Sequence, residues 1–396
     1  RILEHMNHIY WMGIRKSDLL SIDSLYQGSI TFFGDGKDRN ICLFNEGITR
    51  KNHNIELEIF KEFNQKSILQ VLQENPDAKF MFYNPLLAYS LERDLRKRVI
   101  CLNKLDILKV INDKMLCKLW LRDSVKLIET IQIFGIELSL DTLNNLLNNK
   151  REYIVQLPVS SGGTGTYILN SQNQDEVMTK ISPSQLYTVS PYYKDAISLN
   201  IHCVIFEDTF RLYPISIQII KEEDNNLIYK GCDFITGTAL DDDIKKQLRL
   251  QTEKICRKLN QCGYRVVCGI DFMLIDGQVF FCEINPRFQA STIALNLALS
   301  ENHLKTINEA TLNAFSDYKP PAEDLFDMRV PYSLFAYEKN IENAEFHKKI
   351  FQTYFTMYTQ YTLLKDGYTF DADAEQGAYL FRSIFPHPLM DIMNDE

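Results

Sequence analysis

One short segment, which has the pattern of a β-hairpin with an acidic residue at each end, constrains this chain more than any other. Two apolar runs at residues 273–275 and 279–281 are separated by Asp276-Gly277, a dipeptide typical of tight hairpin turns. Asp271 precedes the first run, and Glu283 follows the second, twelve positions later. The alternative interpretation is a core hairpin that ends in a solvated turn.

The spacing of the two acids predicts the shape of this hairpin. Side chains alternate between the faces of a strand, so residues twelve apart share a face when the loop has an odd number of residues. We therefore predict a three-residue loop with Gly277 in the left-handed conformation. Asp271, Glu283 and Asn285 would then direct oxygen donors at one point, with Arg287 two residues further on. Such hard ligands predict a site for Mg2+ that carries phosphate oxygens.

This pattern resembles the ATP-grasp family, specifically the nucleotide core of biotin carboxylase and of the carboxylate–amine ligases. Asp271 and the string Glu-Ile-Asn-Pro-Arg at 283–287 carry the resemblance. It implies ATP as a cofactor, held through Mg2+ or Mn2+ by Asp271, Glu283 and Asn285 as metal ligands. It also implies that Arg287 is catalytic, because the matching residue of the family contacts the reacting phosphoryl or carboxylate group.

Two further elements of the family pattern would bind the phosphates. Lys114, in Asn-Asp-Lys at 112–114, matches the first phosphate lysine and is expected to act in binding and in catalysis; the alternative is a solvated lysine on a helix. A loop rich in glycine and hydroxyl groups can wrap phosphate oxygens with its backbone N–H groups, or it can be a plain hairpin connection. This loop comprises Ser160, Ser161, Gly162, Gly163, Thr164 and Gly165.

The other nucleotide contacts that the resemblance implies depart in part from the family pattern. The family often has a second phosphate lysine where this chain has Gln156, and often a carboxylate near Ser190. Adenine would contact the backbone of Pro191 and Tyr193, and Gln218 would lie near the nucleotide. Gln156 can donate to a phosphate oxygen but brings no charge, which favours a divergent member of the family.

The length of 396 residues predicts several subdomains. Strand-like runs at 29–33 and 78–83 with a helical run between them predict a parallel sheet near the N-terminus. With the resemblance, the predicted fold class is α/β and α+β: an ATP-grasp fold with an N-terminal parallel α/β domain, a small lid subdomain and a larger C-terminal α+β subdomain. The expected boundaries are 6–102 for the N-terminal domain, 103–190 for the linker helix and lid, 191–330 for the C-terminal subdomain with the metal site, and 331–396 for an extension without a motif. Residues 1–5 are expected to be a cloning remnant.

The composition argues against several classes of partner. A net charge of −9 without a Lys/Arg-rich run argues against nucleic acid and anionic membranes. No uncharged apolar stretch reaches the roughly 18–20 residues that a membrane helix needs, and no signal-peptide core opens the chain, so we expect a cytoplasmic location. The nine cysteines lack any C-x-x-C pair and indicate buried thiols of a reducing compartment. A homodimer is compatible with this composition.

The predicted function is that of an ADP-forming ATP-grasp carboxylate–amine ligase. By resemblance, it would activate a carboxylate as an acyl phosphate and couple it to an amine, forming an amide or peptide bond on a small molecule or peptide. Its partners would be small-molecule carboxylate and amine substrates, such as an amino acid or a peptide. Two alternatives stay open: a phosphotransferase or carboxylase on the same core, and a nucleotide-binding protein without turnover, which Gln156 and Ser190 favour. The sequence names neither the acid nor the amine.

Overall fold

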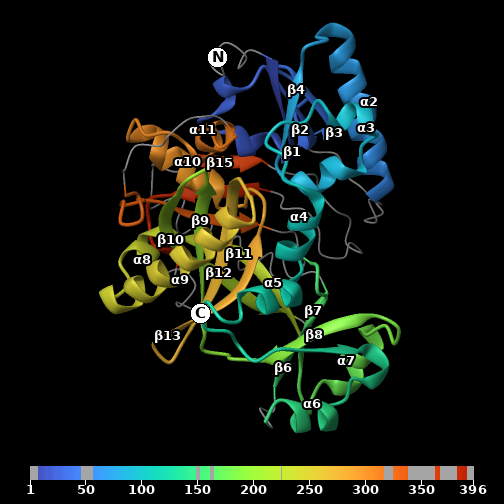
Figure 1. The fold of residues 1–396 in the computed structure, drawn as a ribbon, viewed down its shortest axis with the longest axis vertical. Coiled ribbons are helices and arrows are strands. Elements are labelled where there is room, and N and C mark those ends of the chain that lie inside the picture. Colours follow the sequence, from blue (N-terminus) through green and yellow to red (C-terminus); the bar gives the residue numbers. More distant parts are fainter. Residues whose placement is uncertain are drawn as a thin grey trace.

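The computed structural model describes residues 8–45, 57–148, 152–160, 165–223, 225–315, 324–337, 362–365 and 381–389. Figure 1 shows three parts along the long axis of the molecule, with a small parallel sheet at one end, a small antiparallel lid at the other and the larger part between them. The predicted combination of α/β and α+β architecture is confirmed.

The N-terminal part contains a four-stranded parallel sheet in the order β3-β2-β1-β4. The strands β1, β2 and β4 form because each is a nearly continuous run of apolar and β-branched residues, and the side chains of one face pack into a core that includes Met12, Ile30 and Phe80. The elements are β1 (Ile9–Arg15), η2 (Lys16–Leu19), η3 (Asp23–Leu25), β2 (Gly28–Gly34), β3 (Asn40–Asn45), α2 (Leu57–Glu74), β4 (Lys79–Phe82), η4 (Pro85–Ser90) and α3 (Arg93–Arg96).

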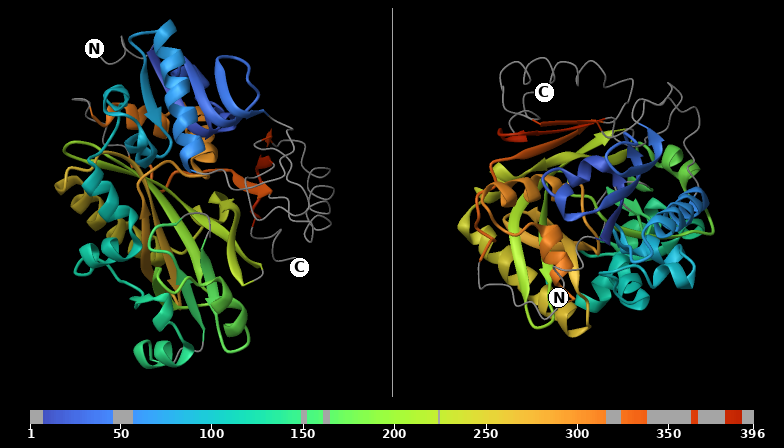
Figure 2. Two further views of the ribbon diagram at one scale, coloured as in Figure 1. Left: turned by 90° about the vertical axis from the view of Figure 1, so that its right-hand side faces the viewer. Right: turned by 90° about the horizontal axis from the view of Figure 1, so that it is seen from above.

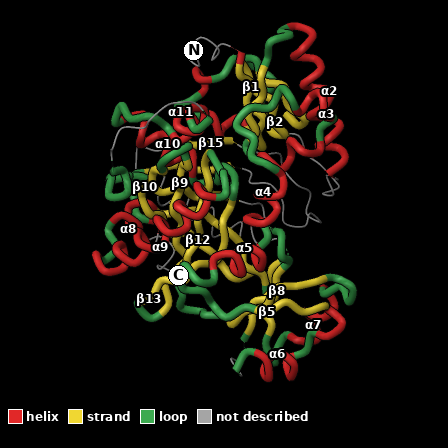
Figure 3. Tube along the Cα trace, viewed as in Figure 1, coloured by secondary structure: helices red, strands yellow, loops and turns green. Residues whose placement is uncertain are grey.

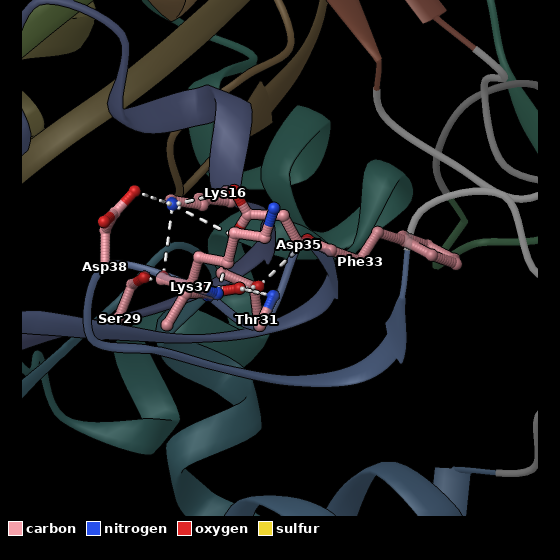
Figure 4. A network of polar contacts seen from close by, with 9 residues as sticks. Lys16, Ser29, Thr31, Phe33, Asp35, Lys37 and Asp38 are labelled. Atoms are coloured by element: carbon pink, nitrogen blue, oxygen red, sulfur yellow. Dashed lines mark hydrogen bonds and ion pairs between the residues drawn. The ribbon is translucent and has the colours of Figure 1, made fainter.

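A charged network fixes the turn after β2, as Figure 4 shows. Lys16 Nζ lies 3.0 Å from Asp35 Oδ1 and 3.5 Å from Asp38 Oδ2, and it donates to the carbonyl oxygen of Lys37 at 3.2 Å. Although burial alone would raise the pKa of the Asp35 carboxyl, the Lys37 backbone N–H and the Lys16 ammonium hold it below its usual range. The network therefore joins η2 to this turn and offsets the charge of Lys16.

The lid is a four-stranded antiparallel sheet in the order β7-β6-β8-β5, with its own core of residues such as Leu143, Tyr153 and Val189. Figure 3 shows its two helices at the outer end of the molecule. Helices α4 (Leu105–Asn112) and α5 (Lys114–Leu121) lead into it. The lid elements are β5 (Ile131–Phe134), η5 (Gly135–Glu137), α6 (Leu140–Leu146), β6 (Tyr153–Gln156), β7 (Thr166–Leu169), α7 (Gln174–Lys180) and β8 (Leu186–Pro191).

The larger part is built on long antiparallel strands in the order β13-β12-β9-β10-β11. The β10–β11 hairpin reaches the lid at its tip, where Asn226 pairs with Tyr167, so that lid and centre form one continuous sheet. The elements are β9 (Ile197–Ile205), β10 (Phe210–Glu223), β11 (Asn226–Asp233), α8 (Phe234–Thr238), α9 (Asp242–Gln261), β12 (Val266–Ile275), β13 (Gln278–Asn285), α10 (Thr292–Glu301) and α11 (Ile307–Asn313).

Three strands near the C-terminus extend this central sheet. Strand β14 (Ser333–Tyr337) pairs with β11, β16 (Phe381–Phe385) pairs with β14, and β15 (Thr362–Lys365) pairs with β16. Figure 2 shows these strands, in red, beside the central part. Residues that carried no recognisable motif thus belong to the main sheet.

Within the described ranges, no helix has both the length and the apolar character required to cross a membrane.

The close approach of β14 to Gly231 gives a test of the C-terminal pairing. Gly231 has φ +148°, and a Cβ added there would lie 2.0 Å from the carbonyl oxygen of Leu334. Gly231→Ala should lower the free energy of unfolding in urea by about 2–4 kcal/mol, since it combines backbone strain with a steric conflict. Gly263→Ala is the matched control, because Gly263 has φ +82° with nothing within 4 Å, and it should lose only about 1 kcal/mol. Equal losses would contradict the pairing.

Candidate active site

The hairpin β12–β13 differs from its prediction in the loop. Its turn contains only two residues, Asp276 with φ 49° and Gly277 with φ 74°, and Ile275 pairs with Gln278 across it. Two positive φ values are typical of the type I′ turn, which follows the right-handed twist of a hairpin. The left-handed Gly277 is confirmed, whereas the predicted three-residue loop is wrong.

A β-bulge places Asp271 and Glu283 on the same face of the hairpin, which the two-residue loop alone would not do. Phe272 pairs with Phe281, but Asp271 pairs with Glu283, so Cys282 is an extra residue on the second strand. A two-residue loop with regular pairing would turn Glu283 to the opposite face from Asp271. The bulge brings the two carboxylates directly opposite each other, and the predicted common face is confirmed.

Helix α5 brings Lys114 to this pair of acids. The helix starts there because the Asp113 carboxylate caps it, accepting two backbone N–H bonds at 2.9 Å each. Lys114 Nζ lies 2.7 Å from Glu283 Oε2 and donates to the carbonyl oxygen of Ser160 at 3.2 Å. The structure therefore places one buried ammonium between a strand carboxylate and the first residue of the glycine-rich loop.

Three amide side chains surround Asp271, which is only 8 % exposed. Asn200 Nδ2 and Gln218 Nε2 donate to its Oδ1 at 2.5 Å and 3.1 Å, and Asn285 Nδ2 donates to its Oδ2 at 2.8 Å. Arg287 donates to Asn285 Oδ1 at 3.1 Å. Lys114, Gln218, Asp271, Glu283, Asn285 and Arg287 are thus joined in one polar network from four elements and the segment after β13.

The two carboxyls have opposite electrostatic environments. Burial, with the adjacent charge of Glu283, raises the pKa of Asp271 to about 7. Burial would also raise the pKa of Glu283, but the positive charges of Lys114 and Arg287 hold it below its usual range. Near neutral pH, Glu283 is therefore ionised, while Asp271 titrates.

The donor set fits Mg2+ that is partly coordinated by phosphates. Mg2+ typically takes one or two protein carboxylates and obtains its other oxygens from phosphate and water. Among the residues the structure describes, no group of three or more His, Cys, Asp or Glu could hold a metal ion, so the candidate site depends on two carboxylates and the Asn285 amide. That amide now directs its N–H group toward the acids, so its oxygen would have to turn to bind a cation.

The remaining predicted residues lie in the lid and its hinge. Gln156 is the last residue of β6 and pairs with Thr188, and Gly165 has φ +65° just before β7. Pro191 ends β8, and the carbonyl oxygen of Tyr193 accepts a backbone bond from Ala196 at 3.1 Å. The described hydrogen bonds do not join these residues to the network around Asp271. Ser161, Gly162, Gly163 and Thr164 lie outside the described residues.

The sequence reasoning missed the support beneath Asp271. Asn200 donates to Asp271 and also to Gln289 Oε1 at 2.9 Å, and both amides are buried. His202 is fully buried 3.0 Å from Thr292 Oγ1, and burial lowers its pKa to about 3. The available signal was the polar set Ser198, Asn200 and His202 at every second position of an otherwise apolar strand.

A second missed residue is Lys118, one helical turn after Lys114. Its Nζ donates to Thr130 Oγ1 at 2.8 Å, and burial lowers its pKa while the charge of Glu283 acts to raise it. The spacing of four placed both lysines on one face of α5 and could have indicated this second cation.

Comparison with known proteins bears on the fold. Residues 111–291 match the ATP-grasp domain family. No curated protein matches the chain significantly. Among solved structures, carboxyaminoimidazole ribonucleotide synthase from Aspergillus clavatus, complexed with ATP, is similar with a TM-score of 0.66 at 14% identity, covering 99% of each chain.

Two other similar structures belong to differently named enzymes. Biotin carboxylase from Campylobacter jejuni, in a β-γ-ATP complex, has a TM-score of 0.63 at 12% identity over 96% of this chain and 87% of that one. Phosphoribosylamine–glycine ligase from Thermotoga maritima has a TM-score of 0.61 at 13% identity over 96% and 92%. At such identities the likeness shows the fold alone.

The raised pKa of Asp271 predicts a pH dependence of stability in the metal-free protein. The folded state keeps this proton up to about pH 7, whereas the unfolded chain releases it near 3.8, so stability from this group falls as pH rises through that window. From pH 5 to pH 8, the wild type should lose about 2 kcal/mol more than Asp271→Asn in urea unfolding with EDTA present. Asp276→Asn, at the exposed turn, is the control and should follow the wild type. Parallel pH curves for Asp271→Asn and wild type would contradict the assignment.

Proposed function

We propose that this chain, an ATP-grasp protein by its fold and by the match of residues 111–291, is an ADP-forming carboxylate–amine ligase. It activates a carboxylate as an acyl phosphate and joins it to an amine, releasing ADP and phosphate. The observation that carries the proposal is the convergence of Lys114, Asp271 and Glu283, with Arg287 joined to them through Asn285. Its substrates are small molecules, and the ATP-bound state of similar structures supports ATP as the nucleotide.

The network has the charges that a triphosphate requires. Mg2+ or Mn2+, held by Asp271, Glu283 and the Asn285 oxygen, would supply the positive charge that offsets the phosphate oxygens. Lys114 adds a fixed ammonium beside the glycine-rich loop, and in a site of low dielectric such a charge acts more strongly than in water. These residues therefore orient the terminal phosphate for transfer.

Arg287 is placed to hold the acid that is activated. Its guanidinium is oriented by bonds to Asn285 Oδ1 and to the carbonyl oxygen of Phe288 at 3.0 Å. A planar guanidinium matches a carboxylate in two parallel hydrogen bonds, so it can position that group against the phosphate. Holding the reacting groups together supplies much of the rate enhancement in such a transfer.

Lys118 supplies a positive charge that compensates for the lysine that Gln156 replaces. It is buried in the same helix face as Lys114, and its hydrogen-bond acceptor, Thr130 Oγ1, is neutral. Two lysines rather than one therefore place positive charge near Glu283. This supports turnover although the chain has Gln156 where the family often has a second phosphate lysine.

The functional test is ADP and phosphate release with Mg2+, ATP and pools of carboxylic acids and amines. A ligase releases both products only when acid and amine are present together. Release with bicarbonate as the only acid would indicate a carboxylase, ADP without free phosphate would indicate a phosphotransferase, and ATP binding without release would indicate a protein lacking turnover.

Glu283→Gln should reduce turnover at least about 100-fold without loss of fold by circular dichroism, since it removes one metal-ligand charge. Unchanged turnover would refute the metal assignment.

Lys114→Met should weaken Mg-ATP binding, measured by isothermal titration calorimetry, by roughly 10- to 100-fold, because it removes one hydrogen bond to a charged group. Lys109→Met, at an exposed position of the preceding helix, is the matched control and should bind like the wild type. Equal affinity in both variants would place the phosphates elsewhere.

A further inference from the structure

The amide of Asn200 is fixed in one orientation beside Asp271. Asn200 lies directly opposite Asp271 in the pairing of β9 with β12, and it is fully buried. Its Nδ2 donates to Asp271 Oδ1 at 2.5 Å and to Gln289 Oε1 at 2.9 Å, so both hydrogens of the amide are used. Turning the amide over would place its oxygen against these two acceptors. The orientation of Asn200 is therefore determined by Gln289 as well as by Asp271.

Gln289 is held where it gives Asn200 this second acceptor. Its backbone N–H donates to Thr292 Oγ1 at 2.9 Å, and that hydroxyl lies 3.0 Å from Nε2 of His202, on the same strand as Asn200. Its side-chain amide lies over Gly269, where an added Cβ would be 1.2 Å from Gln289 Nε2. Since Gly269 has no side chain, it leaves the space that this amide occupies.

The arrangement of the two amides does not serve their own hydrogen bonding. Asn200 Oδ1 and Gln289 Nε2 are buried without a hydrogen bond in the described part of the chain. Two neighbouring amides can form two reciprocal hydrogen bonds, whereas these share one. Buried polar atoms without partners are rare and destabilise a folded protein. The orientation that leaves them unpaired is the one that gives Asp271 a donor.

The two oxygens of Asp271 have different donors. Oδ1 accepts from Asn200 and from Gln218, whose own amide oxygen accepts from Ser198 Oγ at 2.8 Å. Oδ2 accepts from Asn285, the amide that has to turn for its oxygen to bind a cation. When Asn285 turns, Oδ1 keeps both of its donors, while Oδ2 loses this one. Neutral amides also fix the carboxylate without neutralising it, so its charge stays available to a cation.

We propose that Asn200 is a positioning residue of the cation site and that Gln289 holds it in place. Asn200 fixes Oδ1 of Asp271, and Oδ2 is the oxygen left to bind the cation. The inference rests on the proposed function in one respect, the assignment of Asp271 as a metal ligand. Removing a hydrogen bond of this kind from a ligating carboxylate typically lowers metal affinity by about 10- to 100-fold.

The metal-dependent gain in nucleotide affinity measures this effect. Isothermal titration calorimetry gives the affinity for the ATP analogue AMP-PNP with Mn2+ and with EDTA, and the ratio of the two affinities is the gain. Asn200→Leu keeps the approximate size of the side chain and removes the donor. It should reduce the gain by about 10- to 100-fold and leave the affinity in EDTA unchanged, because the cation alone depends on Asp271.

Asn296→Leu is the matched control for the loss of a buried amide. Asn296 is buried, donates to Asn308 Oδ1 at 2.8 Å and accepts from the backbone N–H of Ile307 at 2.9 Å. The described hydrogen bonds do not join it to Asp271, so its variant should lose stability in urea and keep the wild-type gain.

Gly269→Ala tests the role of Gln289 separately, because the added Cβ displaces the Gln289 amide and leaves Asn200 in the chain. Gly269→Ala and Gln289→Ala remove the same acceptor, so each should reduce the gain by about tenfold, and the double variant should reduce it no further. The double variant should regain in urea the stability that Gly269→Ala loses, since no amide remains to meet the new Cβ. A gain that followed stability across these variants would show a purely structural role and overturn the inference.

Two other results would overturn it: an unchanged gain in Asn200→Leu, or a wild type whose nucleotide affinity does not depend on the metal. Should circular dichroism show that Asn200→Leu fails to fold, the Gly269 and Gln289 variants decide.

The measurement separates this inference from the proposed function. A reduced gain in Asn200→Leu together with the absence of ADP release from any acid and amine would refute the ligase and keep the positioning role. Wild-type ligase turnover together with an unchanged gain in Asn200→Leu would refute the positioning role and keep the ligase.

Discussion

The opposition of Asp271 and Glu283 on neighbouring strands is the interaction on which the rest of the site depends. Like charges directly across an antiparallel pair destabilise a sheet, so this arrangement needs compensation from outside the hairpin. Lys114 supplies it to one acid from a separate helix, and the amides of Asn200, Gln218 and Asn285 supply donors to the other. A divalent cation requires the two carboxylates, and a triphosphate requires the lysine. The charge repulsion that destabilises the free protein and the proposed function therefore arise from the same residues.

Separate elements bring the other residues of the site to that hairpin. The central sheet carries the acids, α5 carries the lysine, and the segment after β13 carries Arg287 toward the N-terminal sheet, where Phe288 bonds to Tyr83. Strand β16 approaches the same place from the opposite end of the chain through Arg382. The segment after β13 therefore connects the polar network around Asp271 with the N-terminal sheet.

Much of the fold and part of the site could be predicted from the sequence. The spacing of Asp271 and Glu283 correctly indicated a shared face, although the parity comes from a bulge at Cys282 and not from the loop. Local sequence cannot separate these two solutions, because each inserts one residue into the same hairpin. Asn200 belongs to a polar set at every second position of its strand, but that spacing does not show that its side chain meets Asp271 and Gln289 from other elements. Arg382 was missed because its partner Asp18 lies far away in sequence.

The sequence by itself determined the local elements: the Asp-Gly turn, the capped start of α5 at Asp113, the alternation of strands and helices near the N-terminus, and the ligand types of the candidate metal site. Tertiary structure alone decided which charges meet. Contacts such as Lys114 with Glu283, and Arg382 with Asp18, join residues that no local periodicity relates. Their geometry follows from sheet order and register, which depend on the packing of the whole chain, and that packing brings the separate donors and acids to common points.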